Sequence, residues 1–290
     1  MLQLSDEQRH IFETDGYLHL EGVLNPDEVS LFSGEMERIR QLPGFEASTD
    51  PKVPIGHYEW RDHATDLDEN GELDRHDLLP YHQVFIDLLD RAPVIDYIVD
   101  LMGPNIMYSL SQAICRKPSP NFPGYTHTDG GESLRMIRPA PSSPPIAMKA
   151  MYLLTDVTER DTGNLTVFPG SHAQQIPDPD DRITSPYSPG AVQLMGKAGD
   201  VYLFSHSLWH GPSRNLSNRT RRVLVYNYCQ LWVRSYDHAN VPEVAQHCSS
   251  RQRRLLGDLG YDYMPGSYFY VPRDQKEVIF DSQSLDGTEK

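Results

Sequence analysis

Long apolar runs, paired cysteines and a basic surface are all missing from this 290-residue chain. No apolar run approaches the about 18 residues that a membrane-spanning helix needs, so no membrane segment is expected. The N-terminal residues lack a positive stretch followed by an apolar core, so no secretory signal is expected either. The chain has three cysteines and no short-spaced pair among them: Cys115, Cys229 and Cys248. This spacing argues against a disulfide framework or a cysteine-rich zinc site. The default compartment is therefore reducing and cytoplasmic.

Positive charge is scarce as well. The chain has 26 Lys and Arg against 41 Asp and Glu, a formal charge of −15. This balance argues against binding to nucleic acid or to an anionic membrane, because both need a basic face. It leaves room for a local basic pocket that holds an anionic cofactor. With 38% hydrophobic and 23% charged residues, the composition is typical of a soluble globular protein. We expect one domain over residues 1–290.

Two helix starts stand out near the N-terminus. Ser5-Asp-Glu-Gln8 is a capping-box pattern, and the helix that it begins should end near Gly16. Residues 17–20 then alternate like a strand. Asn25-Pro-Asp-Glu28 combines an N-cap, a proline at the first helical position and a capping-box glutamate. This second helix should run to about Gln41.

The remainder of a helical N-terminal region, residues 1–103, is less regular. Residues 44–79 are rich in charge and turn formers, which predicts a long surface excursion. From Leu79 to Met102 the apolar spacing fits one broken helix or two short ones that end at Gly103.

The character of the chain then changes to short β-type segments. They are rich in β-branched and aromatic residues and separated by turn formers, at about 105–117, 125–129, 146–157, 164–168, 191–194, 200–205 and 221–233. This pattern predicts a mainly β fold with flanking helices, a double-stranded β-helix of jelly-roll or cupin-like type. The core should span 104–235, with a loop at 173–190, an extension at 236–275 and a flexible tail at 276–290.

One pair of side chains can bind a metal. His127 and Asp129 are two residues apart at the end of an expected strand, where both would point to one face. Two histidines and one carboxylate form the facial triad of non-haem Fe(II) oxygenases. The pattern is weak alone, because His57-Tyr-Glu59 repeats it in the charged excursion and a polar surface turn would look the same.

His210 is the expected second histidine of the set. It follows an apolar strand and precedes Gly211-Pro212, which would end that strand. Taken alone, it could instead be a core histidine packed beside Trp209. His206, four residues earlier, is an alternative ligand.

A cation is expected on the strand that starts at Arg221. A guanidinium presented from a barrel strand can hold a carboxylate with two hydrogen bonds. An arginine at this position could equally be a solvated edge charge, and Arg219 and Arg222 are neighbouring candidates.

Together these motifs resemble the phytanoyl-CoA dioxygenase-like family of Fe(II)/2-oxoglutarate oxygenases. The resemblance covers roughly residues 10–235 and lies in segments that occur in the family's order. They are Gly16-Tyr-Leu with Gly22-Val-Leu, Lys117-Pro118 with His127-X-Asp129, Asp161-Thr-Gly-Asn-Leu with Pro169-Gly-Ser-His172, and Gly199-Asp-Val-Tyr-Leu-Phe with Leu208-Trp-His-Gly, Asn215-X-Ser217 and Arg221.

The resemblance implies a role for each matching residue. His127, Asp129 and His210 would bind iron, and Arg221 would hold the distal carboxylate of the co-substrate 2-oxoglutarate. The reaction would use O2, release succinate and CO2, and hydroxylate a C–H bond by default, with desaturation, epimerisation or cyclisation open. The presence of Asp129 disfavours halogenation, because related halogenases carry a small residue there.

Further cofactor contacts are implied at three positions. Lys117, before a proline as in relatives, could bind a cofactor carboxylate or be a solvated loop lysine. Tyr152 falls where relatives place an aromatic residue beside the cofactor, but core packing would also explain it. Gln112 could point into the same cavity or make a core hydrogen bond. His172 is expected to shape a turn.

Two positions depart from the family pattern. Pro212 stands where relatives often carry a cofactor-binding serine, with Ser213 next to it. Thr162 stands where the usual Asn precedes Gly163. The first departure leaves the distal contacts of the cofactor less defined, and neither touches the three expected metal ligands.

The substrate is expected to be a small metabolite or natural-product intermediate. Residues 57–62, 132–138 and 261–270 could line or cover the site. Arg135 and Arg138 could meet an anionic substrate or be solvated. Two alternatives remain open: a jelly-roll metal-binding protein, and a cupin-like metal enzyme that does not use 2-oxoglutarate. Only the 2-oxoglutarate enzyme needs a cation at Arg221. The oligomeric state is left open.

Overall fold

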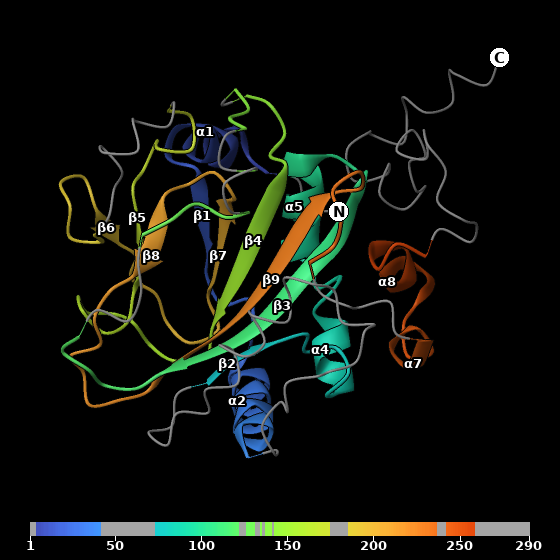
Figure 1. The fold of residues 1–290 in the computed structure, drawn as a ribbon, viewed down its shortest axis with the longest axis horizontal. Coiled ribbons are helices and arrows are strands. Elements are labelled where there is room, and N and C mark those ends of the chain that lie inside the picture. The colour runs from blue at the N-terminus through green and yellow to red at the C-terminus, as the bar shows by residue number, and fades with distance from the viewer. Residues whose placement is uncertain are drawn as a thin grey trace, which may run out of the picture.

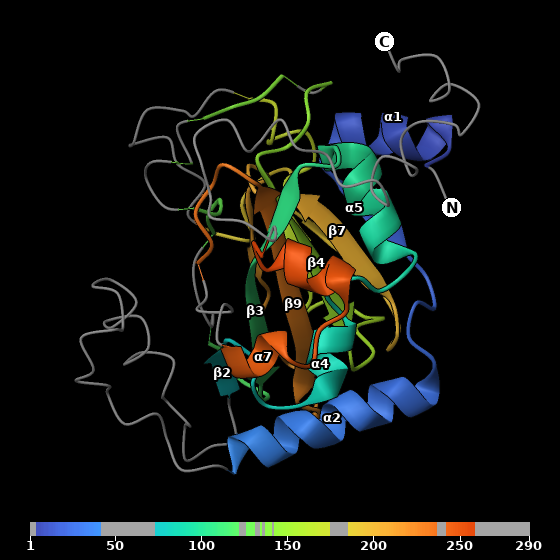
Figure 2. The same cartoon turned by 90° about the vertical axis from the view of Figure 1, so that its right-hand side faces the viewer.

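Two antiparallel sheets and a layer of helices make up the fold (Figures 1 and 2). The computed structural model describes residues 4–41, 73–121, 126–130, 134, 137–140, 142–174, 185–236 and 242–258. The larger sheet has six strands in the order β1-β7-β4-β9-β3-β2, and the smaller has three in the order β6-β5-β8. The expected mainly β fold with a jelly-roll core and flanking helices is confirmed.

The elements follow one another along the chain with these bounds. The helices are α1 (Asp6–Asp15), α2 (Pro26–Arg40), α4 (Gln83–Asp87), α5 (Val94–Met102), α7 (Pro242–Ala245) and α8 (Ser250–Leu255). The strands are β1 (Tyr17–Leu20), β2 (Leu73–His76), β3 (Ile106–Arg116), β4 (Ala147–Leu153), β5 (Leu165–Val167), β6 (Val192–Gln193), β7 (Val201–Ser205), β8 (His210–Pro212) and β9 (Arg221–Gln230).

Both N-terminal helices begin at the expected capping boxes. The Ser5 side chain accepts a hydrogen bond from the Gln8 amide, and Asn25 accepts one from Glu28. Each satisfies an amide that a helix start otherwise leaves without a partner. Helix α1 ends at Gly16 in a left-handed conformation, as expected. Strand β1 follows and pairs with β7.

The expected surface excursion is wrong at its C-terminal end. Residues 73–76 form β2, which pairs with β3 at the edge of the large sheet, and Leu73 is buried. The charged residues of this strand misled the prediction. The charge of Asp74 is matched by polar groups of β3, since its carboxylate accepts hydrogen bonds from Gln112 and from Arg116. Residues 44–72 of the excursion lie outside the described residues.

Alternation along the central strand β4 separates two hydrophobic cores. Met148, Ala150 and Tyr152 belong to the core between the large sheet and the helices. Met151 and Leu153, on the opposite face, belong to the core between the two sheets. Because successive side chains of a strand point to opposite faces, odd-numbered residues of β4 face the interior of the jelly roll.

The helical layer is fastened to β9 by tyrosine hydroxyls. Tyr226 donates to the Phe85 carbonyl over 2.7 Å, and Tyr228 donates to the Leu89 carbonyl over 3.0 Å. The segment from Leu79 to Met102 forms two short helices, α4 and α5, one of the two expected forms.

None of the described helices is long and apolar enough to cross a membrane. The expected tail at 276–290 lies outside the described residues, and the single-domain division stays a prediction.

Gly199 connects the segment before α2 to the large sheet, because its carbonyl accepts from the Leu24 amide and its amide donates to the Leu153 carbonyl. A substitution at Gly199 therefore tests this packing. It has a φ of +97°, and a Cβ there would lie 2.3 Å from the Leu24 carbonyl oxygen. We expect Gly199→Ala to lower the free energy of unfolding by about 2–4 kcal/mol, since backbone strain and a clash add up. Urea denaturation followed by circular dichroism measures this loss.

Gly190→Ala is the matched control for this substitution. Gly190 has a φ of +88°, but a Cβ there would meet nothing within 4 Å. It should therefore lose only the strain contribution of about 1–2 kcal/mol. Equal losses for the two variants would contradict the close approach at Gly199.

Candidate metal centre and cofactor site

Two loops that are far apart in the sequence are held together by backbone hydrogen bonds. The His127 amide donates to the His210 carbonyl over 2.8 Å, and the His210 amide donates back over 2.9 Å. The Asp129 amide donates to the His206 carbonyl over 2.9 Å. The segment at 125–129 was expected as a strand, but its described residues form only a single bridge at His127. This bridge nevertheless places His127 and Asp129 beside His210.

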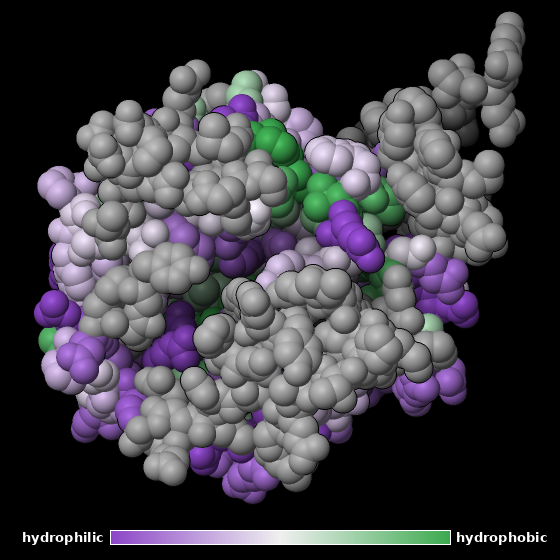
Figure 3. All heavy atoms as spheres, viewed as in Figure 1, coloured by the Kyte–Doolittle hydropathy of each residue, from purple (hydrophilic) through white to green (hydrophobic). Residues whose placement is uncertain are grey.

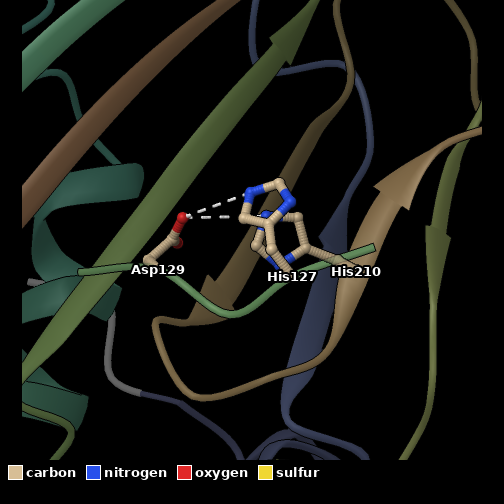
Figure 4. Close-up of side chains that lie close together, drawn as sticks. All are labelled: His127, Asp129 and His210. Atoms are coloured by element: carbon tan, nitrogen blue, oxygen red, sulfur yellow. Dashed lines mark ion pairs between the residues drawn. The ribbon is translucent and has the colours of Figure 1, made fainter. Parts of the chain in front are cut away.

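The three expected metal ligands converge (Figure 4). Oδ1 of Asp129 lies 3.8 Å from Nε2 of His127 and 3.8 Å from Nε2 of His210. These distances are too long for hydrogen bonds. An ion about 2.1 Å from each ligand atom allows separations up to about 4.2 Å. Both distances from the carboxylate oxygen to an imidazole nitrogen fall within this limit, and the three groups form one cluster that could hold a metal ion.

His210 is held in the form that a metal needs. It opens β8, not the end of β7 as expected, and its Nδ1 lies 2.9 Å from the Leu208 carbonyl. A proton on Nδ1 would donate to this oxygen and leave the Nε2 lone pair free. The Phe204 ring packs edge-on against the imidazole. Burial lowers the pKa of His210 to about 3, which keeps it neutral.

Asp129 is kept ionised by the charges around it. Burial works to raise its pKa, but the Lys149 ammonium and the two imidazoles outweigh burial and lower it to about 2. The Lys149 Nζ lies 2.5 Å from Oδ1 of Asp129. A carboxylate that stays charged in a nearly buried position is a strong ligand for a cation.

His206, the alternative ligand, lies outside the set. It is fully buried in the turn after β7, and its Nδ1 lies 3.3 Å from the Ala147 amide and 3.2 Å from the Ala147 carbonyl. Burial lowers the pKa of His206. Its carbonyl receives the Asp129 amide, so His206 supports the ligand loop through its backbone.

Arg221 is the buried arginine among the three candidates. Its residue is 5% exposed, whereas Arg219 is exposed and Arg222 points to the opposite face of β9. The guanidinium approaches the Met151 sulfur at 3.5 Å, and its Nε has no hydrogen-bond partner among the described residues. Burial, with the Arg116 guanidinium adding to it, lowers the pKa of Arg221 to about 10. A buried cation without an anion partner is costly, so this position suits an anionic ligand.

The glycine motif before β5 makes room for Arg221. Gly163 has a φ of +84°, and a Cβ there would lie 3.1 Å from Cβ of Arg221. Asn164 fixes the turn by donating to the Val157 and Leu194 carbonyls. Thr162, the departure from the family pattern, donates its amide to the Asn164 side chain. The turn is therefore built without the usual asparagine at position 162.

The other expected cofactor residues do not gather around the metal ligands. Gln112 donates to Asp74 at the β2 edge of the sheet. Tyr152 is fully buried in the core that faces the helices. Lys117 is half-buried and follows the end of β3. Their roles toward a cofactor stay predictions. His172 lies 3.2 Å from the Glu13 carbonyl, consistent with its expected role in a turn.

Two further side chains that the sequence singled out make local contacts. Arg138 donates to the Ser207 and Ser171 carbonyls, so it braces the turn between β7 and β8. Ser213 donates to the Arg214 carbonyl and to Asn164. Arg135, the rival pair His57 and Glu59, and residues 57–62 and 261–270 lie outside the described residues, as does most of 132–138.

Sequence reasoning missed three polar residues of the site. Lys149 faces the jelly-roll interior from β4, Asn227 is its register partner on β9, and Arg116 is the register partner of Arg221. A lysine inside the apolar run Ala147–Leu153 was a usable signal, because alternation places it on the same face as Met151 and Leu153.

The residues present fit both a divalent metal and a small dicarboxylate. Three ligand atoms leave one side of an ion open, which matches the facial triad of non-haem Fe(II) oxygenases. The partnerless Nε of buried Arg221 fits a carboxylate. Both features lie on the interior side of the large sheet.

The chain is similar to several known proteins. Residues 12–223 match the family model of phytanoyl-CoA dioxygenase. Peroxisomal phytanoyl-CoA dioxygenase from Rattus norvegicus is 24% identical over 246 residues, which cover 78% of this chain and 68% of the relative. Ectoine dioxygenase from Bordetella parapertussis is 26% identical over 281 residues, which cover 86% and 83%.

A solved structure has the same fold. HygX from Streptomyces hygroscopicus with nickel and 2-oxoglutarate bound aligns with a TM-score of 0.62 at 21% sequence identity. The alignment covers 84% of this chain and 94% of HygX.

A jelly roll with a His-Asp-His metal site and a buried arginine defines the class of non-haem iron oxygenases. Because the family model matches well over half of its length, the chain belongs to the phytanoyl-CoA dioxygenase family. The expected class, an Fe(II)/2-oxoglutarate-dependent dioxygenase, is confirmed by the family match and the metal site.

The two buried histidines allow a matched test of the ligand set. His→Asn keeps a polar group near the Nδ1 position and removes Nε2. We expect His210→Asn to weaken Fe(II) binding by more than the about 10- to 100-fold that loss of an outer-shell partner costs. His206→Asn should keep nearly normal affinity. Anaerobic titration calorimetry measures both, and loss of binding only in His206→Asn would reverse the assignment.

Proposed function

We propose that this enzyme hydroxylates a C–H bond of a small metabolite or natural-product intermediate. One observation carries the co-substrate assignment: the guanidinium of Arg221 is buried on the wall of the large sheet that faces the metal ligands, and its Nε has no hydrogen-bond partner among the described residues. When bound, Fe(II) and 2-oxoglutarate supply the O2-derived oxidant for C–H cleavage, with succinate and CO2 as products. The protein contributes position, charge and exclusion of water.

The three metal ligands differ in burial and in charge. His210 is buried and fixed by Leu208 and Phe204, whereas the His127 side chain is 32% exposed. Asp129 supplies the negative charge. With these three groups on one side, the opposite side stays available to the co-substrate and O2.

The Arg221 guanidinium would bind the distal carboxylate of 2-oxoglutarate. The wall beside it consists of Met151, Val223 and Val225 from the core between the sheets. These apolar side chains exclude water, and a charge pair is stronger in such a setting. A cupin-like enzyme without 2-oxoglutarate would need no buried cation here, so Arg221 favours the dioxygenase over that alternative.

The cysteines and the net charge bear on the compartment and on the kind of substrate. Cys115, Cys229 and Cys248 are all free, which supports the expected reducing, cytoplasmic compartment. The net charge of −15 supports a small-molecule substrate over nucleic acid.

The proposed function is tested by absorption spectroscopy without oxygen. Adding Fe(II) and then 2-oxoglutarate should produce a visible metal-to-ligand charge-transfer band, because the co-substrate chelates the iron. Asp129→Ala should show no band. A folded wild-type protein that binds Fe(II) but shows no band with 2-oxoglutarate would refute the proposal.

Arg221 is tested by comparing it with its exposed neighbour. We expect Arg221→Met to weaken 2-oxoglutarate binding by about 10- to 100-fold, because a charge-assisted hydrogen bond contributes about 1.5–3 kcal/mol. Fe(II) affinity should stay normal. Arg219→Met, the matched control, should bind both as wild type does. Titration of the charge-transfer band gives the affinities, and equal affinity in Arg221→Met would move the role to Lys117 or another cation.

A further inference from the structure

A second cation, Lys149, lies beside the metal ligands. The Lys149 side chain is 14% exposed, and its Nζ lies 2.5 Å from Oδ1 of Asp129. This is the same oxygen that faces both imidazoles at 3.8 Å. The ammonium therefore lies next to the position that the metal would take.

Asn227 is the neighbour of Lys149 across the sheet. The two residues are register partners on β4 and β9, so their side chains share the interior face. Asn227 is 8% exposed, and its Oδ1 is buried without a hydrogen-bond partner among the described residues. That oxygen is an acceptor and would face the Lys149 ammonium, whereas the amide nitrogen of Asn227 is the group that can donate to a carboxylate.

The neighbours of Lys149 and Asn227 differ between the two directions along β4. In one direction along β4 lies Met151, which contacts Arg221 and so leads to the proposed co-substrate pocket. In the other lies Ala147, which packs in a small apolar cluster with Met107, Cys229 and Leu231. In Figure 3 hydrophobic atoms gather over this end of β4 and β9, beside a hollow with a hydrophilic wall. The pair thus lies between the co-substrate side and an apolar rim.

Metal binding changes the charge balance at Lys149. In the protein without metal, the ammonium and Asp129 neutralise each other. A bound dication would neutralise the negative charge of Asp129. The remaining positive charge of the metal and the charge of Arg221 would balance the two carboxylates of 2-oxoglutarate. One unit of positive charge then remains at Lys149 in a nearly buried place, which is costly unless an anion pairs with it.

We propose that Lys149 and Asn227 form a subsite for a carboxylate group of the substrate, with the apolar rim taking the rest of the molecule. The inference rests on the proposed function, because the metal and 2-oxoglutarate create the charge imbalance. The substrate class is a monoanionic carboxylic acid with an apolar body. The carboxylate would bind beside the metal and bring neighbouring C–H bonds within reach.

The subsite is tested by magnetic resonance on protein loaded with Mn(II) and saturating 2-oxoglutarate. Mn(II) broadens signals of nuclei close to it, so carboxyl-labelled ¹³C-butyrate should broaden on binding. Butyramide, its neutral counterpart, should broaden far less. We expect Lys149→Met to weaken butyrate binding by about tenfold or more, as loss of a charge-assisted hydrogen bond does. Asn227→Leu should weaken it less.

Three controls separate binding of the substrate from other roles. Lys149→Arg keeps the charge and should retain most butyrate binding. Lys197→Met removes an exposed lysine and should behave as wild type. Lys149→Met should bind Mn(II) at least as tightly as wild type, because a repelling cation has gone.

Each contrary result has a distinct meaning. If butyrate and butyramide broaden equally, or if neither broadens, the carboxylate subsite is wrong. If Lys149→Met loses Mn(II), Lys149 only positions Asp129; if it loses 2-oxoglutarate as strongly as Arg221→Met, Lys149 belongs to the co-substrate pocket. Either result overturns the proposal and leaves the dioxygenase function intact. Absence of the charge-transfer band in wild type would instead refute the function itself.

Discussion

The backbone pairing between the His127 and His210 loops is the constraint on which the site depends. Two reciprocal hydrogen bonds join these residues, and a third joins Asp129 to the His206 carbonyl. The pairing fixes main-chain positions, so the three metal ligands meet without relying on long, adaptable side chains. Such preorganisation is what a metal site with an open side requires, because few protein ligands hold the ion.

The layers of the fold support this pairing from both sides. β7 of the large sheet ends at the turn formed by residues 206–209, and β8 of the smaller sheet begins after that turn at His210. Arg138 braces that turn through the Ser207 carbonyl. On the large sheet, β4 and β9 supply the facing wall, with Lys149 and Asn227 near the metal ligands and Arg221 farther along. The site is therefore assembled between the sheets, from segments distant in sequence.

Much of this arrangement was predictable because local chemistry carried it. Capping boxes at Ser5 and Asn25 marked both N-terminal helices, and the ordered motifs pointed to His127, Asp129 and His210, which converge, and to Arg221, which is buried. Alternation within a strand shows which residues share a face, but it does not show which face meets the interior. For this reason the sequence did not show that Tyr152 lies among the helix-facing residues or that Lys149 faces the interior. The error at β2 has a different cause, since the partners of its Asp74 lie on β3, about 40 residues away in sequence.

In the proposed reaction, iron, 2-oxoglutarate and O2 react at the centre formed by His127, Asp129 and His210. The most direct measurement is mass spectrometry of succinate formed from the iron-loaded enzyme and 2-oxoglutarate under ¹⁸O₂. We expect succinate that carries one ¹⁸O atom in its new carboxylate. Succinate without label, or no succinate above the amount formed by Asp129→Ala protein, would contradict it.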